Sequence, residues 1–221
     1  GRMTAGIAHE IRNPLGIIRG AGQHLERVLS DAGIQDEVAT FIPEEVDRLD
    51  RILSGYLSFG TGQPGPAEDF DVVAVMSRGV RLVADELATT GVTVSGPGVA
   101  GCGLVRGDPR RLQQVCLNLL LNARDAMPGG GLVRIDCVGS ADGKQVQVTV
   151  ADEGTGLGGL DRQRLFEPFR TTKEKGSGLG LAISRRIVED MGGSLELRDR
   201  SDRRGAEAVI TLPLLPAGDG I

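Results

Sequence analysis

Apolar or small residues recur every three or four positions between residues 7 and 29, and this periodicity constrains the fold most strongly. They are Ile7, Ile11, Leu15, Ile18, Gly22, Leu25 and Leu29. Such spacing predicts one long helix with a narrow apolar stripe. The stretch Ser30–Gly33 ends the pattern. A second helix is expected after it, with one face made of Val38, Ile42, Glu45 or Val46, Leu49, Leu53 and Tyr56.

A hairpin of two such helices covers only part of its own apolar stripe. We therefore expect residues 1–60 to pair with a second copy as a homodimeric four-helix bundle. The alternative is a monomeric hairpin packed against the rest of the chain. Residues 60–66 (GTGQPGP) are dense in glycine and proline, which predicts a linker over residues 61–68.

Beyond the linker, the pattern changes to mixed helix and strand. Helical periodicity covers residues 72–87, 109–127 and 178–191. Strand patterns cover residues 92–95, 133–138, 145–151, 195–198 and 208–212, with a hairpin turn at Ala141–Gly143. We expect residues 69–216 to form an α/β sandwich with helices layered on one face of a mixed sheet, so that the fold class of the chain is α+β.

Composition argues against several kinds of partner. Aromatic residues make up 3% of the chain and the net charge is −5, so we expect no nucleic-acid partner. No apolar run approaches the roughly 18 residues that cross a bilayer, so we expect no direct membrane contact in this segment. Three cysteines without C-x-x-C spacing predict reduced thiols in a cytoplasmic protein rather than a zinc site. Because the chain starts with Gly1, we also expect a piece of a longer protein.

The first helix carries the run HEIRNP at residues 9–14. On a helical wheel His9 falls roughly 200° from Ile7, which predicts that its imidazole is exposed. A neutral imidazole is a competent nucleophile, and Glu10 could accept its Nδ1 proton so that Nε2 attacks phosphorus. Asn13 lies one turn later on the same face, where its amide could hold a water against a partner's phosphoryl group.

Two other residues of the first helix, Pro14 and His24, have plainer interpretations. Pro14 removes a backbone hydrogen bond and is expected to bend the helix below the site. The alternative for Asn13 is that it only tolerates this bend. His24 has no acidic or amide neighbour at a useful spacing, so we expect no chemical role for it.

In the helix after Pro109, polar residues flank a predicted core stripe. The stripe consists of Leu112, Val115, Cys116, Leu119, Ala123 and Ala126. Asn118, Asn122 and Asp125 lie beside it, within roughly 60° of one another on the wheel. Amides one turn apart at the edge of a core could hold a hydrated Mg²⁺ ion, which takes few protein ligands. The alternative is a set of ordinary surface amides.

Two glycine-rich turns follow in the second half. Asp152 ends an apolar strand and precedes Gly154 and Gly156, so its carboxylate could accept a hydrogen bond from an adenine amino group. The second turn could cradle phosphates at a helix start; it consists of Gly176, Ser177, Gly178, Leu179 and Gly180. Between the two turns, residues 166–169 (FEPF) precede Arg170, two threonines and Lys173, a segment that could close over a triphosphate.

The order of these segments resembles the catalytic core of bacterial sensor histidine kinases of two-component systems, over residues 1–213. The similar stretches are AHEIRNPL, NLLLNARDAM, DEGTGL, LFEPF and GSGLGLAI. The resemblance implies that His9 is phosphorylated, that Asn122 binds Mg²⁺ and that Asp152 contacts adenine. It further implies the cofactors ATP and Mg²⁺, a response-regulator receiver domain as the partner, and possible phosphatase activity.

This sequence departs mildly from the family pattern and leaves two other functions to consider. Ser177 stands where threonine is commoner, the segment from residue 169 to 176 is short, and Ala208 stands where phenylalanine is frequent. An ATP-driven conformational switch, as in the related gyrase and chaperone ATPases, would need glutamate where Asn118 stands. A scaffold without activity would not need His9, Glu10, Asn122 and Asp152 together. The pattern therefore favours the kinase.

Overall fold

In this computed structural model, the residues described are 2–34, 41–43, 45, 46, 49, 65–100, 102–159, 161–171 and 178–216, without the side chains of residues 2–12, 99 and 100. The chain divides into two units. One consists of Gly1–Gln63 with Pro168–Gly180, and the other of Pro64–Glu167 with Leu181–Ile221. Each unit is described by itself.

Helix α1 (Arg2–Asp31) is a single 30-residue helix that contains Pro14, as its periodicity predicts. Its end is a Schellman motif: the N–H of Ile34 donates to the carbonyl of Leu29 at 2.8 Å and that of Gly33 to Ser30 at 3.0 Å. Gly33 has φ 71°, which glycine adopts without a Cβ penalty. The predicted break after residue 30 is therefore confirmed.

The apolar stripe of α1 is covered only in part. Gly22 is buried, and a Cβ atom placed on it would lie 3.0 Å from both Ile42 Cγ2 and Pro43 Cδ. Residues 41–43, 45, 46 and 49 are helical, whereas the remainder of the predicted second helix lies outside the described residues. Ile18 and Leu25 of the stripe are exposed; outside the stripe, Ile17 is 74% exposed and Val28 is exposed as well.

The second unit contains seven strands, three α-helices and one 3₁₀ helix among its described residues. In chain order they are β1 (Glu68–Asp71), α3 (Val72–Thr89), β2 (Val92–Ala100), β3 (Leu104–Gly107), α4 (Pro109–Ala126), β4 (Gly131–Gly139), β5 (Gln145–Ala151), η1 (Arg164–Phe166), α5 (Gly180–Asp190), β6 (Ser194–Asp199) and β7 (Ala206–Pro213).

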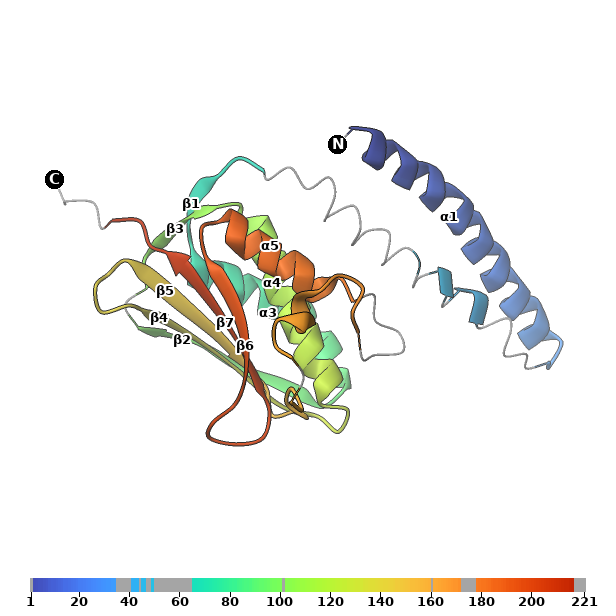
Figure 1. Cartoon of the computed structure of the whole chain (residues 1–221). Helices are drawn as coiled ribbons and strands as arrows, with labels where there is room; N and C mark the ends of the chain where they lie inside the picture. Colours follow the sequence, from blue (N-terminus) through green and yellow to red (C-terminus); the bar gives the residue numbers. More distant parts are fainter. Residues whose placement is uncertain are drawn as a thin grey trace. The chain divides into compact units, whose positions relative to one another are not determined.

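Five strands form one sheet in the order β2-β4-β5-β7-β6. Strands β2 and β4 run parallel and every other neighbouring pair runs antiparallel. Helices α3, α4 and α5 all lie on one face of this sheet (Figure 1). The predicted α/β sandwich with a mixed sheet is confirmed, as is the β4–β5 hairpin, in which Ser140 and Gln145 are bonded across the turn.

The helices begin and pack as their sequences dictate. Asp71 caps α3 by accepting from the N–H of Val73 at 2.8 Å, and Asp108 caps α4 by accepting from Arg110 at 2.9 Å. The buried face of α4 consists of Leu112, Val115, Cys116, Leu119, Leu120 and Ala123. This is the predicted stripe, except that Leu120 joins it and Ala126 is only half-buried.

Several boundaries differ from the sequence prediction. Strands β1 and β3 were not predicted; they have four residues each and pair with one another, too short for an alternation to stand out. Strand β2 runs to Ala100 rather than to residue 95, with a register shift between Ser95 and Gly98. Helix α5 begins at Gly180 rather than at residue 178, because Gly178 has a left-handed φ of 67°.

Candidate functional site

The carboxylate of Asp152 lies just beyond the end of β5 and is 9% exposed. Its Oδ1 atom accepts hydrogen bonds from the N–H groups of Gly154 at 2.8 Å and Ala206 at 3.2 Å. No protein group in the described part of the chain donates to Oδ2. A buried acceptor normally has a partner. This carboxylate therefore has one oxygen fixed by backbone and one oxygen suited to a ligand's N–H.

The glycines after Asp152 let the turn approach the end of α4. A Cβ atom on Gly154 would lie 2.7 Å from the carbonyl oxygen of Ala126 and 2.8 Å from Ala126 Cβ. Gly156 has φ 75°, and a Cβ there would lie 3.0 Å from Asp199 Oδ1. The N–H of Thr155 donates to the carbonyl of Ala126 at 3.3 Å. Gly154 thus lets the turn lie against the end of α4, whereas Gly156 lets it lie against Asp199 and Gly205.

This contact brings the acidic turn and the amide-bearing helix into one region. Asn122 lies one helical turn before Ala126, so it belongs to the end of α4 that residues 154 and 155 touch. Asn122 is half-buried, whereas Asp125 is exposed and accepts a hydrogen bond from Arg124 at 2.7 Å. Asn122 is therefore the predicted metal ligand that lies near the turn of Asp152.

Asn118 takes part in a contact between helices. Its Nδ2 atom donates to Ser184 Oγ at 2.8 Å, and Ser184 on α5 is 1% exposed. No described group donates to its Oδ1 atom. Asn118 thus fixes α5 on α4, a role that its place on the flank of the core stripe did not reveal.

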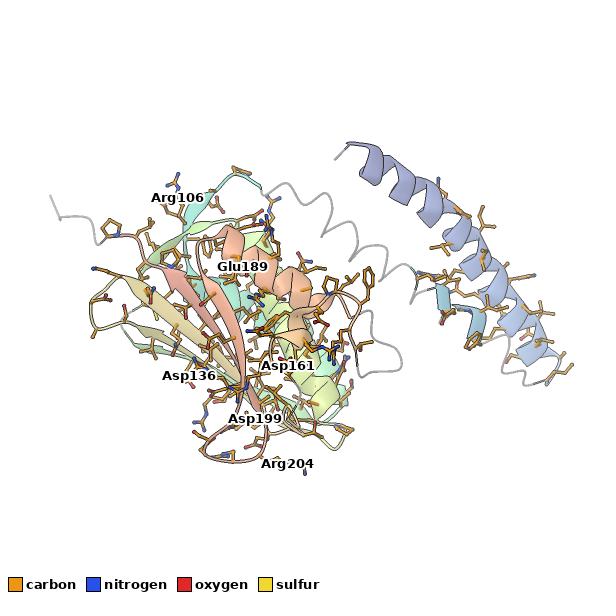
Figure 2. The ribbon with its side chains drawn as sticks, viewed as in Figure 1. Arg106, Asp136, Asp161, Glu189, Asp199 and Arg204 are labelled. Atoms are coloured by element: carbon orange, nitrogen blue, oxygen red, sulfur yellow. The ribbon has the colours of Figure 1, made fainter. Side chains whose placement is uncertain are left out.

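The loop between β6 and β7, residues 200–205, also holds the turn and was missed by the sequence reasoning. Arg200 Nη1 donates to the carbonyl oxygen of Asp152 at 3.1 Å, and Arg203 Nη1 lies 2.8 Å from Glu153 Oε1. Asp199, which precedes the loop, and Arg204 within it lie at one end of the sheet, and Arg106 lies toward the other (Figure 2). The alternation of Arg and Asp over residues 198–204 was the one available signal.

The turn over residues 176–180, which was predicted to cradle phosphates, is described only in part. Gly178 and Leu179 precede α5, which begins at Gly180, and Leu179 is buried. A Cβ on Gly178 would collide with the backbone of Phe169 and Arg170, so glycine is required there. Lys173, Gly176 and Ser177 lie outside the described residues. In the other unit, the Arg185 guanidinium stacks 5.0 Å from the Phe166 ring centroid.

The HEIRNP run, with the predicted phosphorylation site His9, lies within α1. His9 and Glu10 belong to this helix, but their side chains are outside the described part of the structure. Asn13 is exposed, as predicted, and Pro14 is accommodated in the helix interior. His24 is also exposed.

Several other features of the described residues do not involve the predicted site residues. A cavity of about 330 Å³ has walls formed by Arg106, Asp108, Arg111, Asp190, Met191 and Leu214, and no predicted site residue lines it. Within the described ranges, no group of three or more His, Cys, Asp and Glu could hold a metal. The helices described there include none long and apolar enough to cross a membrane. The three cysteines are free thiols.

Comparison with known proteins decides the family. Residues 107–216 match the family of histidine kinase-, DNA gyrase B- and HSP90-like ATPases. Residues 1–65 match the His Kinase A (phospho-acceptor) domain, which separates this chain from the gyrase-like branch. The chain belongs to the sensor histidine kinases. The family resemblance seen in the sequence motifs is thereby confirmed.

Individual histidine kinases are similar along nearly the whole chain. The sensor histidine kinase ZraS of Klebsiella oxytoca is 34% identical over 215 residues, which cover 97% of this chain and 46% of that protein. The chain thus spans about half the length of its curated relatives. Full-length ShkA in complex with AMPPNP superposes with a TM-score of 0.75 at 26% identity, over 98% of this chain and 46% of that one. Histidine kinase ThkA in complex with the response regulator TrrA superposes with a TM-score of 0.66 at 26% identity, over 99% of this chain and 63% of that one.

Proposed function

We propose that this chain is the catalytic core of an ATP-dependent histidine autokinase that phosphorylates His9 and passes the phosphoryl group to a response-regulator aspartate. The observation that carries the proposal is the buried Asp152 carboxylate, with Oδ1 fixed by two backbone donors and Oδ2 without a protein donor among the described residues. The turn that begins at this carboxylate lies beside the end of α4 that carries Asn122. The first helix of the same chain carries the HEIRNP run. The solved ShkA structure holds AMPPNP, an ATP analogue, which supports a nucleotide at this site.

The proposed nucleotide-binding residues supply positioning rather than covalent chemistry. Asp152 Oδ2 accepts a hydrogen bond from the adenine amino group, and Gly154 and Gly156 let the backbone approach the ring. Asn122 ligates Mg²⁺, which neutralises phosphate charge when it is bound. Residues 176–180 and the start of α5 hold the phosphates with backbone N–H groups. In addition, Asn118 and Asp125 shape this site and Lys173 contributes a positive charge.

Phosphoryl transfer then requires one nucleophile on α1. His9 Nε2 forms a bond to the γ-phosphorus while the bond between that phosphorus and the β–γ bridging oxygen breaks, and ADP leaves. Glu10 accepts the Nδ1 proton of the imidazole. The regulator's aspartate next attacks the phosphorus of the phosphohistidine, the bond between Nε2 and phosphorus breaks, and Glu10 returns its proton to Nδ1, which restores the neutral imidazole. Asn13 orients a water for hydrolysis of the resulting aspartyl phosphate, which would make the enzyme bifunctional.

The partly covered stripe on α1 supports a homodimer through residues 1–60, joined by a linker over residues 61–68 to a nucleotide-binding domain over residues 69–216. Ile17, Ile18, Leu25 and Val28 expose apolar side chains along one helix. Exposed apolar surface of this kind marks interaction sites. A match to the phospho-acceptor domain family and the complex of ThkA with TrrA support a second copy and a receiver domain as the two partners.

Nucleotide selectivity tests the proposal. We expect the chain to bind ATP with Mg²⁺ more tightly than GTP, because guanine presents an oxygen where adenine presents an amino group. Asp152→Asn replaces an acceptor with a donor and should weaken ATP binding about tenfold or more, with little change for GTP. Asp85→Asn, on the exposed side of α3, is the matched control and should leave both affinities unchanged. Equal affinity of the unmutated chain for ATP and GTP in calorimetric titrations would refute the contact with adenine.

A further inference from the structure

We infer that Arg200 is a positioning residue for adenine recognition, because its guanidinium fixes the backbone of Asp152 and thereby the direction of the carboxylate. The inference rests on the proposed function of Asp152 in nucleotide binding. It goes beyond that proposal because it assigns a role to the β6–β7 loop, which lies 48 residues further along the chain.

Arg200 has the geometry of a rigid clamp rather than of a surface charge. Its side chain is 7% exposed, although its ionic partner Asp202 is 55% exposed. Nε donates to Asp202 Oδ1 at 2.9 Å and Nη2 to Oδ2 at 2.7 Å, a bidentate pair that fixes the plane of the guanidinium. The remaining Nη1 atom donates to the carbonyl oxygen of Asp152 at 3.1 Å.

With this bond, every polar group of Asp152 except Oδ2 has a hydrogen-bond partner among the described residues. Its N–H donates to the carbonyl of Ala206 at 2.9 Å, its carbonyl accepts from Arg200, and its Oδ1 atom accepts from Gly154 and Ala206. Strand pairing ends one residue earlier, at Ala151 and Glu207. Arg200 therefore supplies the donor that the sheet no longer provides, and Oδ2 is left as the one acceptor for a ligand.

The neighbouring backbone is shaped around the same carbonyl oxygen. Gly205 has φ 131°, and a Cβ atom on it would overlap the Asp152 carbonyl. Only glycine allows the loop to pass so close while Arg200 reaches that oxygen. The hydrogen bond to Asp202 raises the pKa of the Arg200 guanidinium above its usual value, and the nearby carboxylates of Glu153 and Asp152 add to this effect, so the guanidinium stays charged.

Arg203 offers a matched control within the same loop. It too pairs with Asp202, at 3.1 Å, and it contacts Glu153, but none of its bonds reaches Asp152. Its side chain is half-exposed. A general effect of loop charge or loop stability would therefore appear in both Arg200→Met and Arg203→Met, whereas an effect on Asp152 would appear in Arg200→Met alone.

The test compares ATP with purine riboside triphosphate, which lacks the 6-amino group, by calorimetric titration of the full chain. In the unmutated protein we expect ATP to bind about tenfold more tightly, the value of one hydrogen bond to a charged acceptor. Arg200→Met should lower ATP affinity about tenfold and leave purine riboside triphosphate unchanged, so that selectivity disappears. Arg203→Met should keep the selectivity of the unmutated chain.

Two results would overturn the role of Arg200: selectivity that persists in Arg200→Met, or an equal loss of affinity for both nucleotides, which marks general damage to the fold. If circular dichroism shows that Arg200→Met does not fold, Asp202→Asn tests the same interaction. This substitution weakens the bidentate pair between Arg200 and Asp202 and retains Arg200. We expect it to lose about half of the selectivity on a logarithmic scale, that is, about threefold; unchanged selectivity contradicts the inference. An unmutated chain that does not distinguish the two nucleotides would refute the proposed function of Asp152 instead.

Discussion

Gly154→Ala is the substitution whose effect follows most directly from the geometry of the nucleotide region. The added Cβ would lie 2.7 Å from the carbonyl oxygen of Ala126, 2.8 Å from Ala126 Cβ and 2.9 Å from Asp152 Oδ1. Two of these neighbours belong to α4 and its end, and cannot rotate away as a flexible side chain would. The turn must therefore move away from α4.

That movement has a cost that can be worked out from the bonds it strains. Overpacking by one methyl costs about 1–3 kcal/mol, and each strained hydrogen bond adds about 1 kcal/mol. The strained bonds run from Gly154 to Asp152 at 2.8 Å and from Thr155 to Ala126 at 3.3 Å. We expect a loss of about 3–5 kcal/mol, which lowers the melting temperature of a domain of this size by about 10 °C. Because Asp152 shifts with the turn, ATP affinity should fall at least about tenfold.

Gly129→Ala is the matched control, because a Cβ atom on Gly129 meets nothing within 4 Å. Its melting temperature, followed by scanning calorimetry, should stay within about 2 °C of the unmutated value or rise slightly. If Gly154→Ala melts and binds ATP like Gly129→Ala, the close approach of the turn to α4 has no energetic importance. The reasoning that gives Gly154 its role in the site would then be wrong.

Three further outcomes follow from other parts of the chain. Asn13→Ala should slow loss of the regulator's aspartyl phosphate more than it slows autophosphorylation, and equal rates of loss with both proteins would leave Asn13 without a phosphatase role. Light scattering should find residues 1–60 dimeric and residues 68–216 monomeric; a dimeric second fragment would place the interface elsewhere. Burial raises the pKa of Cys116 and of Cys137 to about 12, so at pH 8 both thiols stay protonated and should react with a disulfide reagent only after unfolding. Rapid reaction of either thiol in the folded protein would contradict that.

The elements that the sequence predicted are those with a long local pattern. The core stripe of α4 and the alternation in β4 and β5 each repeat over several turns or pairs, so their faces could be derived before any contact was known. Strands β1 and β3 have four residues each and are defined by their pairing with one another. Such short strands offer too few positions for a periodicity to be recognised.

The residues of the candidate site likewise fall into those that the local sequence predicts and those that it does not. Asp152 and its glycines could be identified because turn residues carry a local signature. Arg200 and the bond of Asn118 to Ser184 could not, since these contacts join residues 48 and 66 positions apart. Only the strand order, which places β7 beside β5, brings the β6–β7 loop to the turn. Long-range side-chain contacts of this kind leave no periodic trace in a single sequence.

Phosphorylation of the purified chain with γ-labelled ATP and Mg²⁺ tests the central proposal most directly. The label should be acid-labile and base-stable, as phosphohistidine is, and chelation of Mg²⁺ should prevent its incorporation. His9→Gln should abolish labelling without loss of nucleotide binding, whereas His24→Gln, an exposed histidine on the same helix, should label normally. Labelling that persists in His9→Gln and disappears in His24→Gln would contradict the assignment of the phosphorylated residue.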